Sequence, residues 1–290
     1  MADQPKVIRK RIKSVESTRK ITRTMEMVAT AKLRAAQDRV SSSGPYMENL
    51  RHLMGDIGGS DVDVSTWPQF DIREVKRSLI FVVTGNRGLC GGYNAHLVSL
   101  ARRVADAKLA EGKEIELYVA GKKGASALRF AGYDLTATFS DELLDNPTLD
   151  EAEFFLDQIR SPFLRRDVDE VVIVYAHWES SARQPPSTLS LYPIAPDAAA
   201  EGASGAPIFE PSASAILDRL LLRYERQVMY SVLAEAVASE QVARRMAMKQ
   251  ATDNAAEIAD ELNLKYNKAR QAMITKELSE IIGGAEALKG

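Results

Sequence analysis

The residues best suited to chemistry lie in a glycine-rich turn, Thr84–Asn94 (TGNRGLCGGYN). An apolar run, Leu79–Thr84, precedes the turn and predicts a buried strand, and a helical pattern follows it. A turn between a strand and a helix often holds a phosphate. However, its glycines do not match the G-x-G-x-x-G spacing, and it lacks the G-K-[ST] of a P-loop. Arg87 could meet an anion, but a tight turn needing glycine at positive φ explains the pattern more simply.

Other candidate residues are weaker. Gly121–Gly124 (GKKG) is a second, shorter turn of the same kind. Cys90 is the only cysteine, so no internal disulfide can form, and no histidine lies near it in sequence. The histidines at 52, 96 and 177 show no metal-ligand spacing, and no acidic pair is placed for acid–base work. We therefore expect no catalytic residue, no metal and no cofactor.

The first forty residues are basic, with eleven Lys or Arg against four acids. Such a segment could bind nucleic acid or resemble a mitochondrial presequence. It contains no aromatic residue for base stacking, and the whole chain has a formal net charge of −2. We expect no nucleic-acid partner, and we interpret the basic side as the solvated face of an amphipathic helix.

The middle of the chain predicts an α/β domain over residues 77–194. Apolar runs alternate with helical patterns, which implies a largely parallel, Rossmann-like sheet. Thr148 and Glu151 have the spacing of a capping box at the start of a helix. The predicted strands are 79–84, 114–120, 133–139 and 171–175, with an edge strand at 188–193, and the predicted helices are 95–110, 122–130 and 148–160.

The two ends predict unusually long helices. Residues 212–282 contain neither proline nor glycine, and apolar residues recur there at steps of three and four. Residues 6–43 show a similar stripe, Ser41–Pro45 predicts a break or kink, and Gly58–Gly59 ends the pattern. Neither stripe can be satisfied alone, so we expect an antiparallel two-helix coiled coil with the α/β domain inserted between its helices. The predicted division is 1–58 (helix), 59–76 (linker), 77–194 (α/β domain), 195–211 (flexible segment) and 212–290 (longer helix).

These patterns leave two classes of function open. One is a structural or mechanical coiled coil, which could be a static adaptor. The other is a nucleotide- or metabolite-binding α/β enzyme with helical arms. No apolar run approaches the roughly 18 residues that span a bilayer, so we expect no direct membrane insertion.

Several segments together resemble the gamma subunits of F-type ATP synthases. Ile8–Leu33 is similar to that family's N-terminal helix, and Arg87–Asn94 to its glycine-rich turn. The C-terminal helix matches at 238–241 with Arg244 and at 266–271. Ile274–Ala285 fits the signature I-T-x-E-x-x-E-x-x-x-G-A. The resemblance is close at both ends and looser in the α/β domain.

The resemblance implies a central-stalk rotor. Its partners would be three alpha and three beta subunits, the epsilon subunit and the c-subunit ring. Proton flow would turn the ring and the rotor, and the beta subunits would carry out catalysis, so this chain would hold no catalytic residue while regulating ATPase activity. No transit peptide precedes the segment that resembles the start of the family. We therefore expect a peripheral location on the cytoplasmic face of a bacterial inner membrane.

The resemblance also implies contact residues. Those expected to meet the alpha and beta subunits are Met25, Glu240, Arg244, Arg270, Gln271 and Thr275. Phe209 and Glu210 fall where the family approaches the c-ring.

Overall fold

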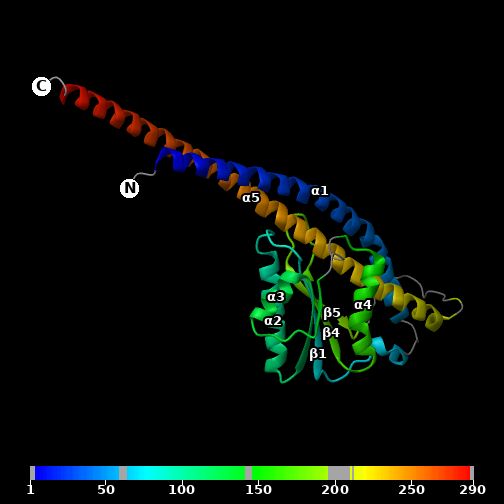
Figure 1. Cartoon of the computed structure of the whole chain (residues 1–290). Helices are drawn as coiled ribbons and strands as arrows, with labels where there is room; N and C mark the ends of the chain where they lie inside the picture. The colour runs from blue at the N-terminus through cyan, green and yellow to red at the C-terminus, as the bar shows by residue number, and fades with distance from the viewer. Residues whose placement is uncertain (1–3, 59–63, 141–145, 195–209, 211, 288–290) are drawn as a thin grey trace. The chain divides into compact units, whose positions relative to one another are not determined.

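The computed structural model describes residues 4–58, 64–140, 146–194, 210 and 212–287 (Figure 1). The chain forms two compact units. Residues 1–29 with 244–290 make up what we call the helical unit, and residues 30–243 make up the α/β unit. Two long helices, α1 (Pro5–Gly58) and α5 (Ala213–Ala287), contribute residues to both.

The α/β unit contains a five-stranded sheet in the order β3-β2-β1-β4-β5. The strands pair in parallel except for β5, which runs antiparallel at one edge. Their bounds are β1 Arg77–Val83, β2 Glu114–Ala120, β3 Ala137–Phe139, β4 Glu170–Ala176 and β5 Pro186–Tyr192. The helices and short 3-10 turns of this unit are η1 Val64–Thr66, η2 Pro68–Phe70, α2 Tyr93–Ala110, α3 Lys122–Phe130 and α4 Leu149–Leu164.

The predicted α/β elements are present, with shifted ends at several of them. The capping box at the start of α4 is confirmed, because the Thr148 side chain accepts from the Glu151 amide and Glu151 accepts from the Thr148 amide. The third strand is shorter than expected, since residues 133–135 form no regular structure and pairing starts only at Ala137. The edge strand begins two residues earlier than predicted, at Pro186.

Both faces of the sheet are covered, so β1 is buried on both sides. Leu79, Phe81 and Val83 belong to a core that also holds residues of α1, α4 and α5. Ile80 and Val82 belong to a second core with α2 and α3. The alternation of side chains along the strand assigns each residue to its face.

The sequence predicts a break or kink at Ser41–Pro45. Helix α1 does not break there, and it continues through Pro45 to Gly58. Proline removes one backbone hydrogen bond in a helix interior, which normally costs about 3 kcal/mol. Here Met47 and Leu50 are buried in the core on the far side of Pro45, and Ala36 is buried before it. Packing on both sides therefore outweighs the local preference of the sequence.

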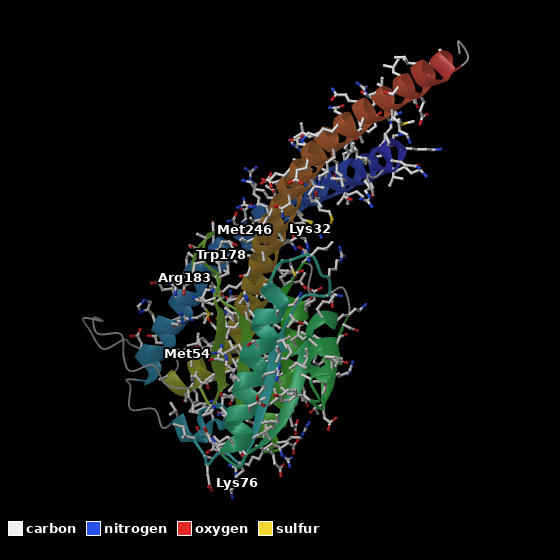
Figure 2. All side chains as sticks on the ribbon, turned by 90° about the vertical axis from the view of Figure 1, so that its left-hand side faces the viewer. Lys32, Met54, Lys76, Trp178, Arg183 and Met246 are labelled. Atoms are coloured by element: carbon white, nitrogen blue, oxygen red, sulfur yellow. The ribbon has the colours of Figure 1, made fainter. Side chains whose placement is uncertain are left out.

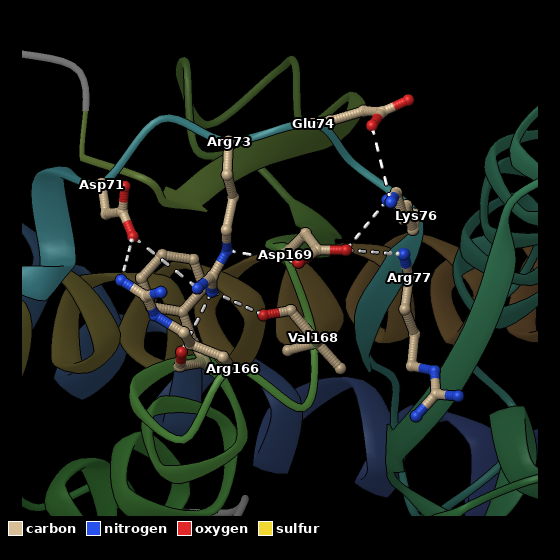
Figure 3. Close-up of polar contacts among 9 residues, drawn as sticks. Asp71, Arg73, Glu74, Lys76, Arg77, Arg166, Val168 and Asp169 are labelled. Atoms are coloured by element: carbon tan, nitrogen blue, oxygen red, sulfur yellow. Dashed lines mark hydrogen bonds and ion pairs between the residues drawn. The ribbon is translucent and has the colours of Figure 1, made fainter.

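The segment that leads into β1 is tied to the loop between α4 and β4 (Figure 3). Arg73 Nε lies 3.2 Å from Asp169 Oδ1, and Arg73 Nη2 donates to the Val168 carbonyl at 2.7 Å. Asp169 Oδ2 also accepts from the Lys76 and Arg77 amides. The described part of the expected linker, residues 64–76, is thus packed against the α/β unit, and the division of the chain into five segments stays a prediction.

The helical unit is an antiparallel pair. Thr22 on α1 meets Thr252 on α5, while Lys6 and Arg9 line a common cleft with Tyr266. Residue numbers therefore rise on one helix as they fall on the other. The buried seam consists of Ile8, Ile12, Thr22 and Ala29 from α1 and of Met248, Thr252, Ala255 and Ala259 from α5. The expected pairing of the terminal helices is confirmed within this unit.

Candidate partner-binding surfaces

The carboxyl-terminal edge of the sheet, where α/β proteins usually bind ligands, is covered by α5 of the same unit (Figure 1). Tyr93 Oη donates to the Ala236 carbonyl at 3.1 Å, and Ser239 Oγ donates to the Ala176 carbonyl at 3.3 Å. The Glu235 carboxylate accepts from the Trp178 amide at 2.9 Å. The same carboxylate lies 2.7 Å from His177 Nδ1.

Aromatic residues at this edge join the contact. Trp178 packs with Ala36, Val237 and Ala238, beside α5 (Figure 2). Burial raises the pKa of Tyr175 well above its usual value, and the nearby Glu235 carboxylate adds to this increase. Sequence reasoning named Tyr93 and Ser239 only as members of the family-like segments 87–94 and 238–241, and it did not name Glu235, because a helical stripe gives no sign of what its polar residues will face.

The glycine-rich turn uses its polar groups internally. Thr84 Oγ1 donates to the Ala120 carbonyl and accepts from the Gly124 amide. The next amides at the start of α3 are also paired, since Lys122 N donates to Asn86 Oδ1 and Lys123 N donates to the Gly85 carbonyl. These donors would otherwise be available to a phosphate at a helix N-terminus. The turn therefore uses these hydrogen bonds to hold the loop after β1 against the start of α3.

Glycine is required here for close approach. A Cβ at Gly121, whose φ is +103°, would lie 2.2 Å from the Thr84 carbonyl oxygen. A Cβ at Gly85 would lie 2.9 Å from Glu240 Oε1, so the Glu240 carboxylate sits directly against the turn. Glu240 is only 7% exposed. A phosphate at Gly85 would meet this carboxylate, which weighs against a nucleotide site at the turn.

The tip of the turn faces outward. Leu89 has a φ of 62° and is 62% exposed, and Arg87 is also exposed. The turn therefore presents these two side chains to solvent. The sequence indicated the turn but not the direction of Leu89, because its positive φ could not be read from a residue type that rarely adopts it.

The structure places most of the predicted contact residues in the helical unit. Met25 and Arg244 are half-buried there, whereas Arg270, Gln271 and Thr275 are exposed. Thr275 Oγ1 donates to the Gln271 carbonyl one turn earlier, so its side chain lies along its own helix. Glu240 belongs to the α/β unit, where it is buried. The six contacts with partner subunits stay predictions.

The last part of α5 has no buried residue. Every residue from Gln271 to Ala285 is exposed, including Leu278, Ile281 and Ile282. Within the helical unit, α5 continues beyond the start of α1 at Pro5 (Figure 1). A cleft of about 790 Å³, lined by Lys6, Arg9 and Lys276 among others, marks the place where the pair gives way to a single helix.

The remaining predicted contact sites are Phe209 and Glu210. Glu210 is exposed, and Phe209 lies outside the described residues. Across the described ranges, no helix combines the length and the apolar character needed to cross a bilayer. The described histidines, cysteine and acids form no group able to hold a metal ion.

Comparison with known proteins gives a consistent match along the chain. Residues 4–288 match the family model described as ATP synthase. The ATP synthase gamma chain of Gemmatimonas aurantiaca is 42% identical and covers 98% of this chain and 99% of its own length. The ATP synthase gamma chain of Maridesulfovibrio salexigens is 37% identical with the same coverage.

Solved structures agree in fold. The mitochondrial ATP synthase of Euglena gracilis, in an assembly of OSCP, F1 and c-ring, contains a chain with a TM-score of 0.69 and 20% identity. The match covers 98% of this chain and 94% of that one.

Proposed function

Because this chain belongs to the ATP synthase family and matches gamma chains over nearly its whole length, we propose that it is the central-stalk rotor of an F-type, proton-translocating ATP synthase. In this role it couples proton flow through the membrane c-ring to the conformational cycle of the catalytic beta subunits, and it regulates ATPase activity. The gamma chain is not itself an enzyme, since the reaction takes place in the beta subunits.

The observation that carries this proposal is the exposed end of α5. Leu278, Ile281 and Ile282 leave apolar surface exposed to water at the end of a single helix. Such a surface favours contact with other protein, so we expect partner subunits to surround this segment. The hexamer of alpha and beta subunits would surround the segment in this way. An apolar, weakly directional contact also lets the helix turn inside it, since burial of apolar surface has no preferred angle.

The unequal helices supply the asymmetry that a rotor needs. A single helix at the tip and a pair below it present different surfaces around the axis of the helical unit. Each beta subunit therefore meets a different face at any moment, and rotation presents the faces in turn. We assign the contacts with alpha and beta to Met25, Arg244, Arg270, Gln271 and Thr275, and an indirect part in these contacts to Glu240.

Glu240 requires a different role from the exposed residues. Its carboxylate faces the turn at Gly85, so little of it is available to a partner. It acts on a partner by fixing the turn that presents Arg87 and Leu89. In the complex reconstituted with alpha and beta subunits, a Glu240→Gln variant that keeps the turn should therefore retain more ATPase activity than a Glu240→Lys variant.

The α/β unit is the foot of this rotor. By family resemblance it stands on the c-ring beside the epsilon subunit, with Phe209 and Glu210 near the ring. The chain is then a peripheral protein on the cytoplasmic face of a bacterial inner membrane. The segment boundaries 1–58, 59–76, 77–194, 195–211 and 212–290 are proposed for the shaft, linker, foot, flexible segment and longer shaft helix.

Reconstitution tests the assignment to the complex. The chain mixed with matching alpha and beta subunits should give a soluble ATPase whose rate exceeds that of alpha and beta alone. An unchanged rate would count against the proposal. Calorimetry with ATP and the purified chain tests the alternative function. Binding of ATP at micromolar concentration would favour a nucleotide-binding enzyme.

A reversible cross-link distinguishes a rotor from a static adaptor. Thr275→Cys, in a Cys90→Ser background, would be paired with a cysteine in the facing loop of beta. Oxidation should stop turnover and reduction should restore it, because the helix can no longer rotate. The control is the same chain with unmodified beta, which should remain active under oxidation. Full activity of the cross-linked complex would indicate an adaptor.

A further inference from the structure

A fully buried carboxylate lies where α5 packs on the α/β domain. Glu225 is 0% exposed, and it is surrounded by Arg160 of α4, Tyr192 of β5 and Gln69 of η2. All four belong to the α/β unit. Three other elements thus direct polar side chains at one residue of α5, within a core that is otherwise apolar. An ionised carboxylate in such a place is costly unless it is well paired.

The charges around Glu225 are already nearly balanced without it. Arg160 Nη2 lies 2.6 Å from Asp157 Oδ1, whereas Arg160 Nη1 lies 3.4 Å from Glu225 Oε2. The shorter contact gives the guanidinium its main counter-charge, and the longer one is at the limit of a hydrogen bond. Glu225 is therefore a second carboxylate beside one cation.

The hydrogen bonding around Glu225 is incomplete in the same way. Among the described residues, Glu225 Oε1, Tyr192 Oη and Gln69 Oε1 are all buried without a hydrogen-bond partner. An ionised Glu225 has only acceptors to offer. A protonated Glu225 has one O–H to donate and can still accept from the tyrosine hydroxyl.

The electrostatics point in the same direction. Burial, the largest cause, raises the pKa of Glu225, and the opposing effects of Arg160, Tyr192 and Gln69 do not cancel it. Burial and the Glu225 carboxylate likewise raise the pKa of Tyr192. The folded chain therefore holds the Glu225 proton at a pH where an unfolded chain would release it.

We propose that Glu225 is a positioning residue that fastens α5 to the α/β domain as a protonated carboxylic acid, and that loss of this proton loosens the fastening. Apolar contacts along the first part of α5, such as those of Leu221 and Val228, do not select one rotation of the helix. A buried polar residue does, because only one rotation brings it to its partners. The polar contacts of Glu235 and Ser239 act farther along α5, at the carboxyl-terminal edge of the sheet, and Glu225 adds one at the α4 side.

The neighbouring charged groups do not supply this fastening. Arg226, the next residue, pairs with Asp150 at 3.2 Å and Glu153 at 3.4 Å on the same α4–α5 seam. Both acids are more exposed than Glu225, so their pairs are screened by solvent. Asp157, the remaining acid beside Arg160, is half exposed as well. Glu225 is the acid of this seam that is wholly removed from water.

The test uses the full chain assembled with its partner subunits. Nitroxide labels are placed before assembly at Ala107→Cys on α2 and Arg223→Cys on α5, in a Cys90→Ser background, since both sites are exposed. The width of the label–label distance distribution is measured from about pH 5 to about pH 9. Glu225→Gln keeps the shape and a neutral donor, Glu225→Leu removes both, and Glu153→Gln is the matched control on the same seam.

The parent chain should give a narrow distribution at low pH that broadens as the pH rises. Glu225→Gln should stay narrow at every pH, Glu225→Leu should be broader than Glu225→Gln at every pH, and Glu153→Gln should follow the parent. An identical pH response of the parent and Glu225→Gln would overturn the proposal. So would a Glu225→Leu distribution as narrow as that of Glu225→Gln.

Equilibrium unfolding provides a second readout that a merely structural role would not move. The folded pKa of Glu225 is raised, so its stabilisation is present at low pH and is lost as the pH rises through that pKa. Relative to Glu225→Gln, the folding constant of the parent should fall by up to about tenfold per pH unit in this window. An unchanging ratio would contradict the proposal. The inference rests on the proposed function only for the choice of the partner subunits with which the chain is assembled, and neither readout needs ATPase activity.

Discussion

The α/β unit and the helical unit satisfy their side chains in opposite ways. The α/β unit buries apolar residues on both faces of its sheet and pairs the polar groups of its turns with one another. The helical unit has a narrow buried seam, and α5 has no buried residue from Gln271 to Ala285. The α/β unit buries a large apolar core within itself, whereas the end of α5 in the helical unit leaves its apolar residues exposed.

Helix α5 shows this contrast within a single element. Val232, Leu233, Ala236 and Val237 are buried in the α/β unit, so a whole side of the helix and more is covered there. In the helical unit the buried positions thin out to Met248, Thr252, Ala255 and Ala259 and then stop. A rotor needs one surface that is fixed to the rest of its own chain and another that turns against its partners. One long helix can carry both.

The largest expected effect is in the core of the α/β unit. Phe81 is fully buried and contacts the rings of Phe139 and Phe155. Phe81→Ala should lower the free energy of unfolding by about 3–5 kcal/mol, because it removes apolar contact and leaves a cavity. Ile281→Ala, at the exposed tip, should change it by no more than about 0.5 kcal/mol. Urea unfolding of both variants checks this, and similar losses would erase the contrast between the units.

Glycines in the two units should respond to alanine with opposite sign. Gly121→Ala places a Cβ against the Thr84 carbonyl at a positive φ and should cost about 3 kcal/mol. Gly283 lies in the helix with nothing within 4 Å of a new Cβ, so Gly283→Ala should add about 1 kcal/mol of helix stability. Thermal unfolding monitored by circular dichroism measures both. A stabilising Gly121→Ala would show that the turn is not packed as described.

The exposed stripe should make the isolated chain associate with itself. Replacing Ile281 and Ile282 by serine removes apolar surface from the tip and should reduce this association several-fold. Sedimentation velocity over a range of concentrations gives the measurement. Leu164→Ser, an exposed apolar position in the α/β unit, is the control and should have less effect. Equal behaviour of the two variants would mean that the tip is not the sticky surface.

The smallest effect concerns the polar contact in the seam of the helical unit. Thr252 Oγ1 lies 2.8 Å from Thr22 Oγ1 and can instead donate to the Met248 carbonyl. Thr252→Val keeps the shape and should cost about 1 kcal/mol, because Thr22 still donates to the Arg19 carbonyl. Hydrogen exchange of the amides near Thr22 and Thr252 reports the change. A loss above about 3 kcal/mol would indicate that the pair also fixes the register.

Regular patterns were sufficient for much of the fold. The strand at 114–120 and the helix at 122–130 were predicted with the bounds that the structure shows. Their ends are set by Gly112, Gly121 and Gly132, each at positive φ, and glycine announces such turns in the sequence. The capping box at Thr148 is similarly local, because its partner is three residues away.

Long-range packing accounts for what the sequence did not reveal. Pro45 indicated a break or kink, yet burial of Met47 and Leu50 keeps α1 continuous. The orientation of Glu240 toward Gly85 and the burial of Glu225 depend on how α5 lies on the sheet. A helical stripe defines which residues share a face, but not which of them will meet a turn, a strand or another protein.

Both tryptophans of the chain touch α5 in the α/β unit. Trp67 Nε1 donates to Asp218 Oδ1 at 2.7 Å, and the Trp178 amide donates to Glu235. Trp178 also packs against Val237 and Ala238. Intrinsic fluorescence of the unmodified chain therefore reports on the packing of α5 inside the α/β unit at two places, and a red shift of the emission would signal that water has entered there.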